Sequence, residues 1–203
     1  LFYAIATGLL RVFFHLFYGF KVTGRENVPM AGAIIVVANH ASALDPLALG
    51  VACPRQLRFM AKAELFDNPI LALILRGLRA FPVKRGQVDR DAYRTSMEAL
   101  KAGDALGIFP EGTRSRSGEL QAAHPGAARF SMKTGAPIVP AAVVGTFAGR
   151  RKDVKRFREA RVRVVFGAPI HPKVPDEGRI TREDSDRLAH QIMERIQDLI
   201  DAA

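Results

Sequence analysis

Short apolar runs recur along the chain and are separated by segments that suit helices. After Lys21–Gly24, which reads as a short first strand, we predict strands at residues 33–38, 57–61, 79–83, 105–109, 138–144 and 161–166. We predict helices at about residues 46–52, 69–77, 90–102, 125–134 and 182–201. Strands that alternate with helices predict an α/β fold with a largely parallel central sheet flanked by helices.

Two of these segments have the clearest patterns. The run Ile34–Ala38 is apolar without alternation, which indicates a strand buried on both faces of a parallel sheet. The last predicted helix starts with Thr181 and has Asp184 three residues later, a pattern like the capping box. Its apolar stripe consists of Leu188, Ile192, Ile196, Leu199 and Ile200. Loops that follow parallel strands share one edge of the sheet, so motifs in those loops are expected to form one site.

Residues 1–20 are almost continuously apolar and rich in Phe. Thr7, Arg11 and His15 interrupt them four positions apart, so these three share one face of a helix. Such a helix is roughly 30 Å long and could cross a bilayer, but a central Arg makes that costly. We expect an amphipathic anchor, with residues 21–203 as the α/β domain. A simple span and a core helix packed on the sheet are the alternatives, and no cleavable signal peptide is indicated.

Composition narrows the class of protein. The 203 residues suit one domain with a substantial core, since 48% of them are apolar. Cys53 is the one cysteine, so an internal disulfide is excluded and a small buried side chain is expected. The net charge of +10 favours an anionic partner, and its densest stretch runs from Arg150 to Arg163. Aromatic residues do not accompany that stretch, so an anionic membrane or a phosphorylated substrate is favoured over nucleic acid.

A candidate general base lies in the loop after the buried strand. His40 and Asp45 stand five positions apart, and Asp45 followed by Pro46 suits the start of a helix, with Asp45 as the N-cap. A neutral imidazole can take a proton from a hydroxyl, while a nearby carboxylate fixes its tautomer and stabilises the imidazolium. The alternative is that Asp45 is only a helix cap.

Two further motifs place polar side chains directly after strands. Arg79–Gly86 leads from a strand to Lys84 and Arg85, and an Arg can bind a phosphate through two parallel hydrogen bonds. The run Ile108–Ser115 ends a strand in a turn that carries Glu111, Gly112, Thr113 and Arg114. The last two of these can donate to phosphate oxygens, whereas the Glu can accept from a substrate hydroxyl or hold an Arg. A solvated loop and a tight surface turn are the alternatives.

The remaining candidates carry little chemistry. Gly135–Ala141 brackets the start of a strand with two prolines, which suits a structural role or the wall of an apolar pocket. The other histidines lack the spacing of metal ligands, so we expect no metal site: they are His15, His124, His171 and His190.

In order and spacing these motifs resemble those of the 1-acyl-glycerol-3-phosphate acyltransferases of the glycerolipid acyltransferase superfamily, over about Lys21–Phe166. The specific parts are Asn39-His40 with Asp45, Arg85 and the run Phe109–Ser115. The resemblance implies a membrane-associated enzyme that moves a fatty acyl group from a thioester to a lysophospholipid hydroxyl, with residues 21–203 as its acyltransferase domain. It also implies that Arg85 contacts the phosphate and that residues 111–113 form the Glu-Gly-Thr turn of the family. Val83-Lys84 stand where the family often has Ile and Asp, and the short N-terminal segment resembles the bacterial members.

The expected reaction starts with His40 as general base on the sn-2 hydroxyl of lysophosphatidic acid, with Asp45 orienting the imidazole. The alkoxide attacks the thioester of acyl-carrier protein or coenzyme A directly, which gives phosphatidic acid for phospholipid biosynthesis and needs no cofactor. The expected acceptor-binding residues are Lys84, Arg85, Glu111, Gly112, Thr113 and Arg114. The expected location is the inner (cytoplasmic) face of the bacterial cell membrane, where anionic phospholipids attract the basic surface. A different lysolipid acceptor and a non-catalytic basic membrane-binding protein are the alternatives.

Overall fold

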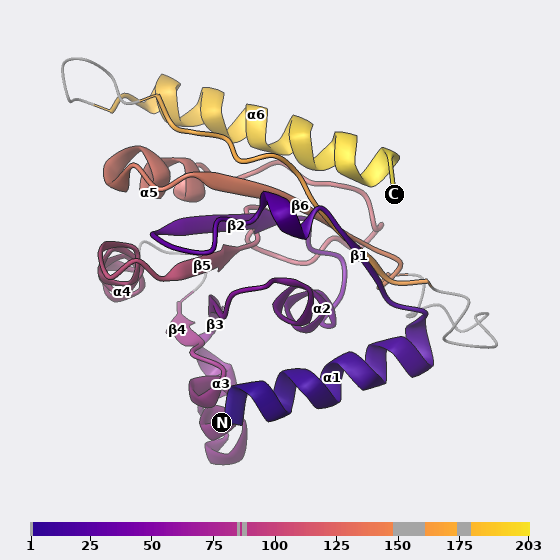
Figure 1. The fold of residues 1–203 in the computed structure, drawn as a ribbon. Helices are drawn as coiled ribbons and strands as arrows, with labels where there is room; N and C mark the ends of the chain where they lie inside the picture. The colour runs from indigo at the N-terminus through magenta and orange to yellow at the C-terminus, as the bar shows by residue number, and fades with distance from the viewer. Residues whose placement is uncertain (1, 85, 87–88, 148–160, 174–179) are drawn as a thin grey trace.

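The computed structural model describes residues 2–84, 86, 89–147, 161–173 and 180–203 (Figure 1). Its helices are α1 (Phe2–Tyr18), α2 (Asp45–Ala52), α3 (Pro69–Gly77), α4 (Arg90–Lys101), α5 (Gly126–Thr134) and α6 (Arg182–Asp201). Two short 3-10 helices, η1 (Arg25–Asn27) and η2 (Ala63–Phe66), lie between them. The strands are β1 (Lys21–Thr23), β2 (Ile34–Ala38), β3 (Leu57–Lys62), β4 (Phe81–Val83), β5 (Ala105–Ile108), β6 (Ile138–Val144) and β7 (Arg163–Phe166). Each predicted strand and helix is present, with its ends within about two residues of the expectation.

The strands form one sheet in the order β1-β7-β6-β2-β5-β3-β4. Neighbours among β2 to β6 pair in parallel, whereas β7 runs antiparallel to β6 and parallel to β1. The predicted α/β fold with a largely parallel sheet is therefore confirmed. The carboxyl ends of β2, β5, β3 and β4 meet at one edge, which is where the sequence motifs were expected to gather.

The central strand β2 explains why its sequence is continuously apolar. All five of its residues are buried, and they alternate between two apolar layers. Ile34, Val36 and Ala38 pack in the layer that also contains side chains of α1 and α2. Ile35 and Val37 face the other layer, where α4, α5 and α6 contribute. Figure 1 shows the same division, with α6 and α5 on one side of the sheet and α1 and α2 on the other. Because β2 is covered on both faces, none of its side chains faces solvent, and every position favours an apolar residue.

The last helix begins as its sequence predicts. The Thr181 hydroxyl accepts a hydrogen bond from the backbone N–H of Asp184, and the Asp184 carboxylate accepts one from the backbone N–H of Thr181. The reciprocal bonds satisfy donors that a helix start leaves free. Leu188, Ile192 and Ile196 are buried, so the predicted apolar stripe anchors α6 on the sheet.

The first helix packs on the protein along one side only. Phe14 and Tyr18 are buried, and the Arg11 guanidinium donates a 3.3 Å hydrogen bond to the carbonyl of Val51 near the end of α2. The polar face of α1 therefore includes a contact with the protein, because Arg11 reaches carbonyls that the end of α2 leaves without helical partners. Apolar side chains remain exposed elsewhere on α1: Phe2, Ile5, Leu9, Val12, Phe13, Leu16 and Phe17. Among the residues described, no helix combines the length and the hydropathy needed to cross a membrane.

Candidate active site

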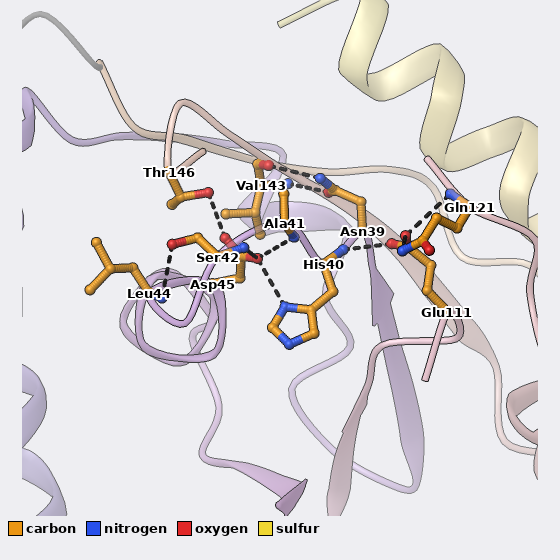
Figure 2. A network of polar contacts seen from close by, with 10 residues as sticks. All are labelled: Asn39, His40, Ala41, Ser42, Leu44, Asp45, Glu111, Gln121, Val143 and Thr146. Carbon is orange, nitrogen blue, oxygen red and sulfur yellow. Dashed lines mark hydrogen bonds and ion pairs between the residues drawn. The ribbon is translucent and has the colours of Figure 1, made fainter. Parts of the chain in front are cut away.

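His40 lies in the loop between β2 and α2, as the sequence predicts, but Asp45 is not the helix cap. The N-cap is Leu44, and Asp45 is the first residue of α2. Its carboxylate turns back toward the loop, where Oδ2 accepts from Nδ1 of His40 at 2.9 Å. The same oxygen accepts from the backbone N–H groups of Ala41 at 2.7 Å and Ser42 at 2.6 Å (Figure 2). The prediction of an N-cap was wrong by one residue, because this carboxylate orders the loop before the helix and not the helix itself.

The Asp45 carboxylate is fully buried, with 0% of the residue exposed. A buried charge is tolerated only when hydrogen bonds replace its lost water. Oδ2 has three donors, and Oδ1 accepts from the hydroxyl of Thr146 at 2.5 Å. An ionised carboxylate can only accept, so the proton of a neutral His40 lies on Nδ1. Nε2 then carries the free lone pair, and Figure 2 shows it facing away from Asp45.

The turn after β5 holds His40 from the other side. Oε1 of Glu111 accepts from the backbone N–H of His40 at 2.6 Å, and the backbone N–H of Ser115 donates to the His40 carbonyl at 2.7 Å. The ring of Phe109 stacks on the imidazole, with 4.3 Å between the ring centres. Three residues of one short turn therefore determine where the His40 backbone and ring lie.

Glu111 is buried, with 4% of the residue exposed. Its second oxygen, Oε2, accepts from the backbone N–H of Gln121 at 3.2 Å and from the side-chain amide at 3.0 Å. Both carboxylate oxygens thus have partners within the protein, and contact between Glu111 and a substrate stays a prediction. Gly112 follows with a positive φ of 69°, and a Cβ there would lie 3.0 Å from the ring of His124. The turn therefore requires glycine at this position.

The structure describes some of the residues that were predicted to bind the phosphate, but not all of them. Arg114 is exposed in the turn after β5 and lines the same cavity as His40. Thr113 beside it is exposed as well. Lys84 is exposed at the end of β4, where its backbone N–H donates to Asp89 at 2.7 Å. Arg85 lies outside the described residues, as does most of the basic stretch from 150 to 163.

A cavity of about 480 Å³ opens beside His40. Its walls are mainly apolar and come from α1, α2, β3, η2 and the end of α3, including Leu10, Leu47, Phe59, Leu65 and Leu75. Arg114 and Lys62 add positive charge to the lining. None of the described residues of 135–141 lines this cavity, and most of them are buried in or beside β6. Pro140 lines a separate cavity together with Gly167 and Leu199, so both predicted roles of the proline-bracketed motif stay predictions.

Several residues of the site have no role in the sequence motifs as interpreted above. The side-chain amide of Asn39 exchanges two hydrogen bonds with the backbone of Val143 in β6, at 2.8 and 3.0 Å. Thr146 binds Asp45, while Ser115 and Gln121 complete the contacts of His40 and Glu111. Thr146 follows the end of β6 in the same way that His40 follows the end of β2. A search of every loop after a parallel strand would have included it.

Comparison with known proteins gives the class of this fold and site. A family model described as Acyltransferase matches residues 19–144, which contain β1 to β6 together with His40, Asp45 and Glu111. The matched part of the fold is therefore an acyltransferase domain, and it contains the candidate site around His40.

Individual relatives narrow the class. The 1-acyl-sn-glycerol-3-phosphate acyltransferase of Bacillus subtilis is 33% identical over 170 residues, which cover 83% of this chain and 82% of that protein. A chloroplastic 1-acyl-sn-glycerol-3-phosphate acyltransferase of Arabidopsis thaliana is 33% identical over 168 residues, or 79% of this chain and 46% of the plant protein. The crystal structure of the 1-acyl-sn-glycerophosphate acyltransferase of Thermotoga maritima superposes with a TM-score of 0.75 at 27% identity, over 97% of this chain and 79% of that one. The chain belongs to the 1-acyl-sn-glycerol-3-phosphate acyltransferase family, which confirms the resemblance identified from its motifs.

Proposed function

We propose that this protein transfers a fatty acyl group from a thioester of acyl-carrier protein or coenzyme A to the sn-2 hydroxyl of lysophosphatidic acid, giving phosphatidic acid. The observation that carries the proposal is the 2.9 Å contact between Nδ1 of His40 and the buried Asp45 carboxylate, at the wall of an apolar cavity. The family names of its relatives support the same reaction.

In the proposed mechanism, Nε2 of His40 takes the proton of the sn-2 hydroxyl as the oxygen attacks the thioester carbonyl. Asp45 stabilises the imidazolium that forms and keeps the ring oriented. When the tetrahedral intermediate collapses, the carbon–sulfur bond breaks and His40 returns the proton to the leaving thiolate. The acyl group passes directly between substrates. Cys53 is unsuited to be a nucleophile because burial raises the pKa of its thiol to about 11, which keeps it protonated at neutral pH.

Substrate binding divides into a charged part and an apolar part. Arg114 shares the cavity with His40 and is positioned to meet a phosphate there, with Thr113 beside it. Lys84 follows β4 at the same edge of the sheet, and both Lys84 and Arg85, the next residue in the sequence, would add charge for the same phosphate. The apolar cavity walls suit an acyl chain that enters between α1, α2 and α3.

The apolar surface of α1 supports a peripheral position on the inner face of the bacterial membrane. Leu9 is 68% exposed and Leu73, on α3, is 73% exposed, which is costly in water. The ring of Phe2 packs against Gly77, where an added Cβ would lie only 2.5 Å from the ring. The start of α1 and the end of α3 are therefore in contact. These two helices also line the cavity beside His40, which would place the site at the lipid surface. The net charge of +10 would attract anionic phospholipids.

Purified His40→Ala protein tests the proposal. We expect kcat for acyl transfer to lysophosphatidic acid to fall by roughly 10²–10⁴-fold, because a positioned general base contributes about that much. Far-UV circular dichroism should show the wild-type fold, and His190→Ala, on the exposed side of α6, should keep full activity. Both acyl-carrier protein and coenzyme A thioesters are offered in the assay.

Three outcomes would contradict parts of the proposal. Near wild-type turnover by His40→Ala would refute the mechanism. Faster acylation of another lysolipid in direct competition would correct the acceptor. Binding to vesicles without any acyl transfer would instead support a non-catalytic membrane protein.

A further inference from the structure

Thr146 occupies an unusual place beside the His40–Asp45 pair. It follows β6 after Gly145, whose φ is 91°, and it is 1% exposed. Its hydroxyl donates to Oδ1 of Asp45 at 2.5 Å, while Oδ2 of the same carboxylate accepts from His40 (Figure 2). Thr146 and Asp45 are 101 positions apart in the sequence. Thr146 lies just beyond residues 19–144, which the family model matches.

We propose that Thr146 is a positioning residue for acyl transfer, whose hydroxyl fixes the rotation of the Asp45 carboxylate and through it the orientation of His40. The proposal rests on the function proposed for His40 and Asp45. The terminal torsion of an Asp side chain is broad, so packing alone constrains it weakly. The backbone N–H groups of Ala41 and Ser42 hold Oδ2, and the Thr146 donor holds Oδ1, so the carboxylate is fixed at both oxygens against rotation that would carry Oδ2 away from Nδ1. A hydrogen bond to an ionised acceptor is also stronger than a neutral one.

The hydroxyl comes from a firmly held part of the fold. Asn39, directly before His40, bonds both the N–H and the carbonyl of Val143 in β6. The chain then turns at Gly145 and delivers Thr146 to the other oxygen of Asp45. A β-branched side chain has few χ1 rotamers, which further limits where its hydroxyl points. The end of β6 therefore holds the His40 loop at one side and the Asp45 carboxylate at the other.

Thr146→Val tests the role of the hydroxyl, since Val has nearly the same shape and no donor. We expect kcat to fall by roughly 10–100-fold, as for loss of one hydrogen bond to a charged group, with KM for both substrates within about twofold of wild type. Thr146→Ser keeps the donor and should restore most of kcat. The matched control is Thr134→Val, because the Thr134 hydroxyl donates to a backbone carbonyl at 2.7 Å at the end of α5, before β6 begins.

Two kinetic readouts separate this role from a purely structural one. A loss in kcat at unchanged KM, recovered by Thr146→Ser, indicates that His40 is misplaced in a folded enzyme. The far-UV circular dichroism of Thr146→Val should match that of wild type. Glu111 and Arg114, which also lie beside His40, are unchanged in this variant.

A double-mutant cycle distinguishes failure of this inference from failure of the proposed function. In an Asp45→Asn background, Thr146→Val should cause little further loss, because the two residues act through one carboxylate. Full activity of Asp45→Asn alone would refute the proposed His40–Asp45 mechanism, whereas absence of acyl transfer by the wild-type protein would refute the proposed function. If Asp45→Asn lowers kcat but Thr146→Val keeps a kcat within twofold of wild type, or loses activity mainly through KM, the positioning role is refuted. Should Thr146→Val not fold, Thr146→Ser must exceed Thr146→Ala in kcat by about tenfold, and equal values would refute the role.

Discussion

Two buried carboxylates divide the support of His40 between them. Asp45 binds the ring at Nδ1, and Glu111 binds the backbone N–H. Each has its remaining oxygen held by a third residue, Thr146 for Asp45 and Gln121 for Glu111. Buried polar groups that are fully satisfied favour a single geometry. The position of His40 is therefore set by residues from four separate parts of the chain.

Glu111→Ala separates a positioning role from acceptor binding. We expect kcat to fall by roughly 10–100-fold with KM for lysophosphatidic acid within about threefold, because the buried N–H of His40 loses its acceptor. Steady-state kinetics with varied acceptor give both constants. Glu98→Ala, on the exposed side of α4, provides the control. A rise in KM with unchanged kcat would return Glu111 to the acceptor-binding role expected from the sequence.

At the scale of elements, α1 has two different sides. One side packs on α2 through Phe14 and through the bond from Arg11 to the Val51 carbonyl. The other exposes large apolar side chains, and α3 exposes more of them at Ile70 and Leu73. A soluble surface rarely carries so many adjacent apolar groups. We therefore expect the apolar side of α1 to enter the lipid headgroup layer if the protein binds a membrane as proposed.

Leu9→Glu should weaken binding to vesicles of phosphatidylglycerol. In the membrane-bound state Leu9 would be inserted in the headgroup layer. Replacing it with a charged side chain there should lower the partition coefficient between vesicle and water by roughly 10-fold or more. Sedimentation with vesicles measures the bound fraction. Gln197→Glu adds the same charge on exposed α6, across the sheet from α1, and should bind nearly as wild type does (Figure 1). Equal binding by Leu9→Glu and wild type would show that this side of α1 does not contact lipid.

At the scale of the whole molecule, two buried layers enclose the sheet and one of them contains Cys53. Burial raises the pKa of its thiol from 9.0 to about 11 and that of the Tyr3 hydroxyl to about 12. The unfolded chain releases the thiol proton near pH 9, whereas the folded chain keeps it until about pH 11. The folded state thus binds more protons in this window, and its stability falls as pH rises through it.

Cys53→Ala should make the free energy of unfolding depend less on pH in the alkaline range. Between about pH 8.5 and 11, wild type should lose about 2–3 kcal/mol relative to this variant, which corresponds to a shift of about two pKa units. Urea unfolding at a series of pH values measures the difference. The loss above pH 10 that comes from burial of the Tyr3 hydroxyl should remain in both proteins, but it should be smaller in the variant, because the Cys53 charge also raises the pKa of Tyr3. Parallel curves for the two proteins would mean that Cys53 ionises alike in the folded and unfolded chains.

Much of this fold follows from local pattern. The continuous apolar run of β2 predicted a strand buried on both faces, and Thr181 with Asp184 predicted the start of α6. The polar face of α1 could also be predicted from the sequence. That this face would turn toward the end of α2 could not, because the position of α2 depends on the tertiary structure. Asp45 shows the limit most clearly. A helix start was predicted correctly to within one residue, yet the carboxylate serves the preceding loop.

The sequence by itself determined the elements, their order and the placing of His40, Asp45 and the turn at 109–115 after parallel strands. Those features depend on neighbours within a few positions, and their order was enough to indicate the family. Only the tertiary structure decided which atoms meet. Glu111 reaches a backbone N–H 71 positions away and Thr146 a carboxylate 101 positions away. Such contacts arise because strands distant in sequence lie side by side in one sheet, and no local pattern records which of their side chains will face each other.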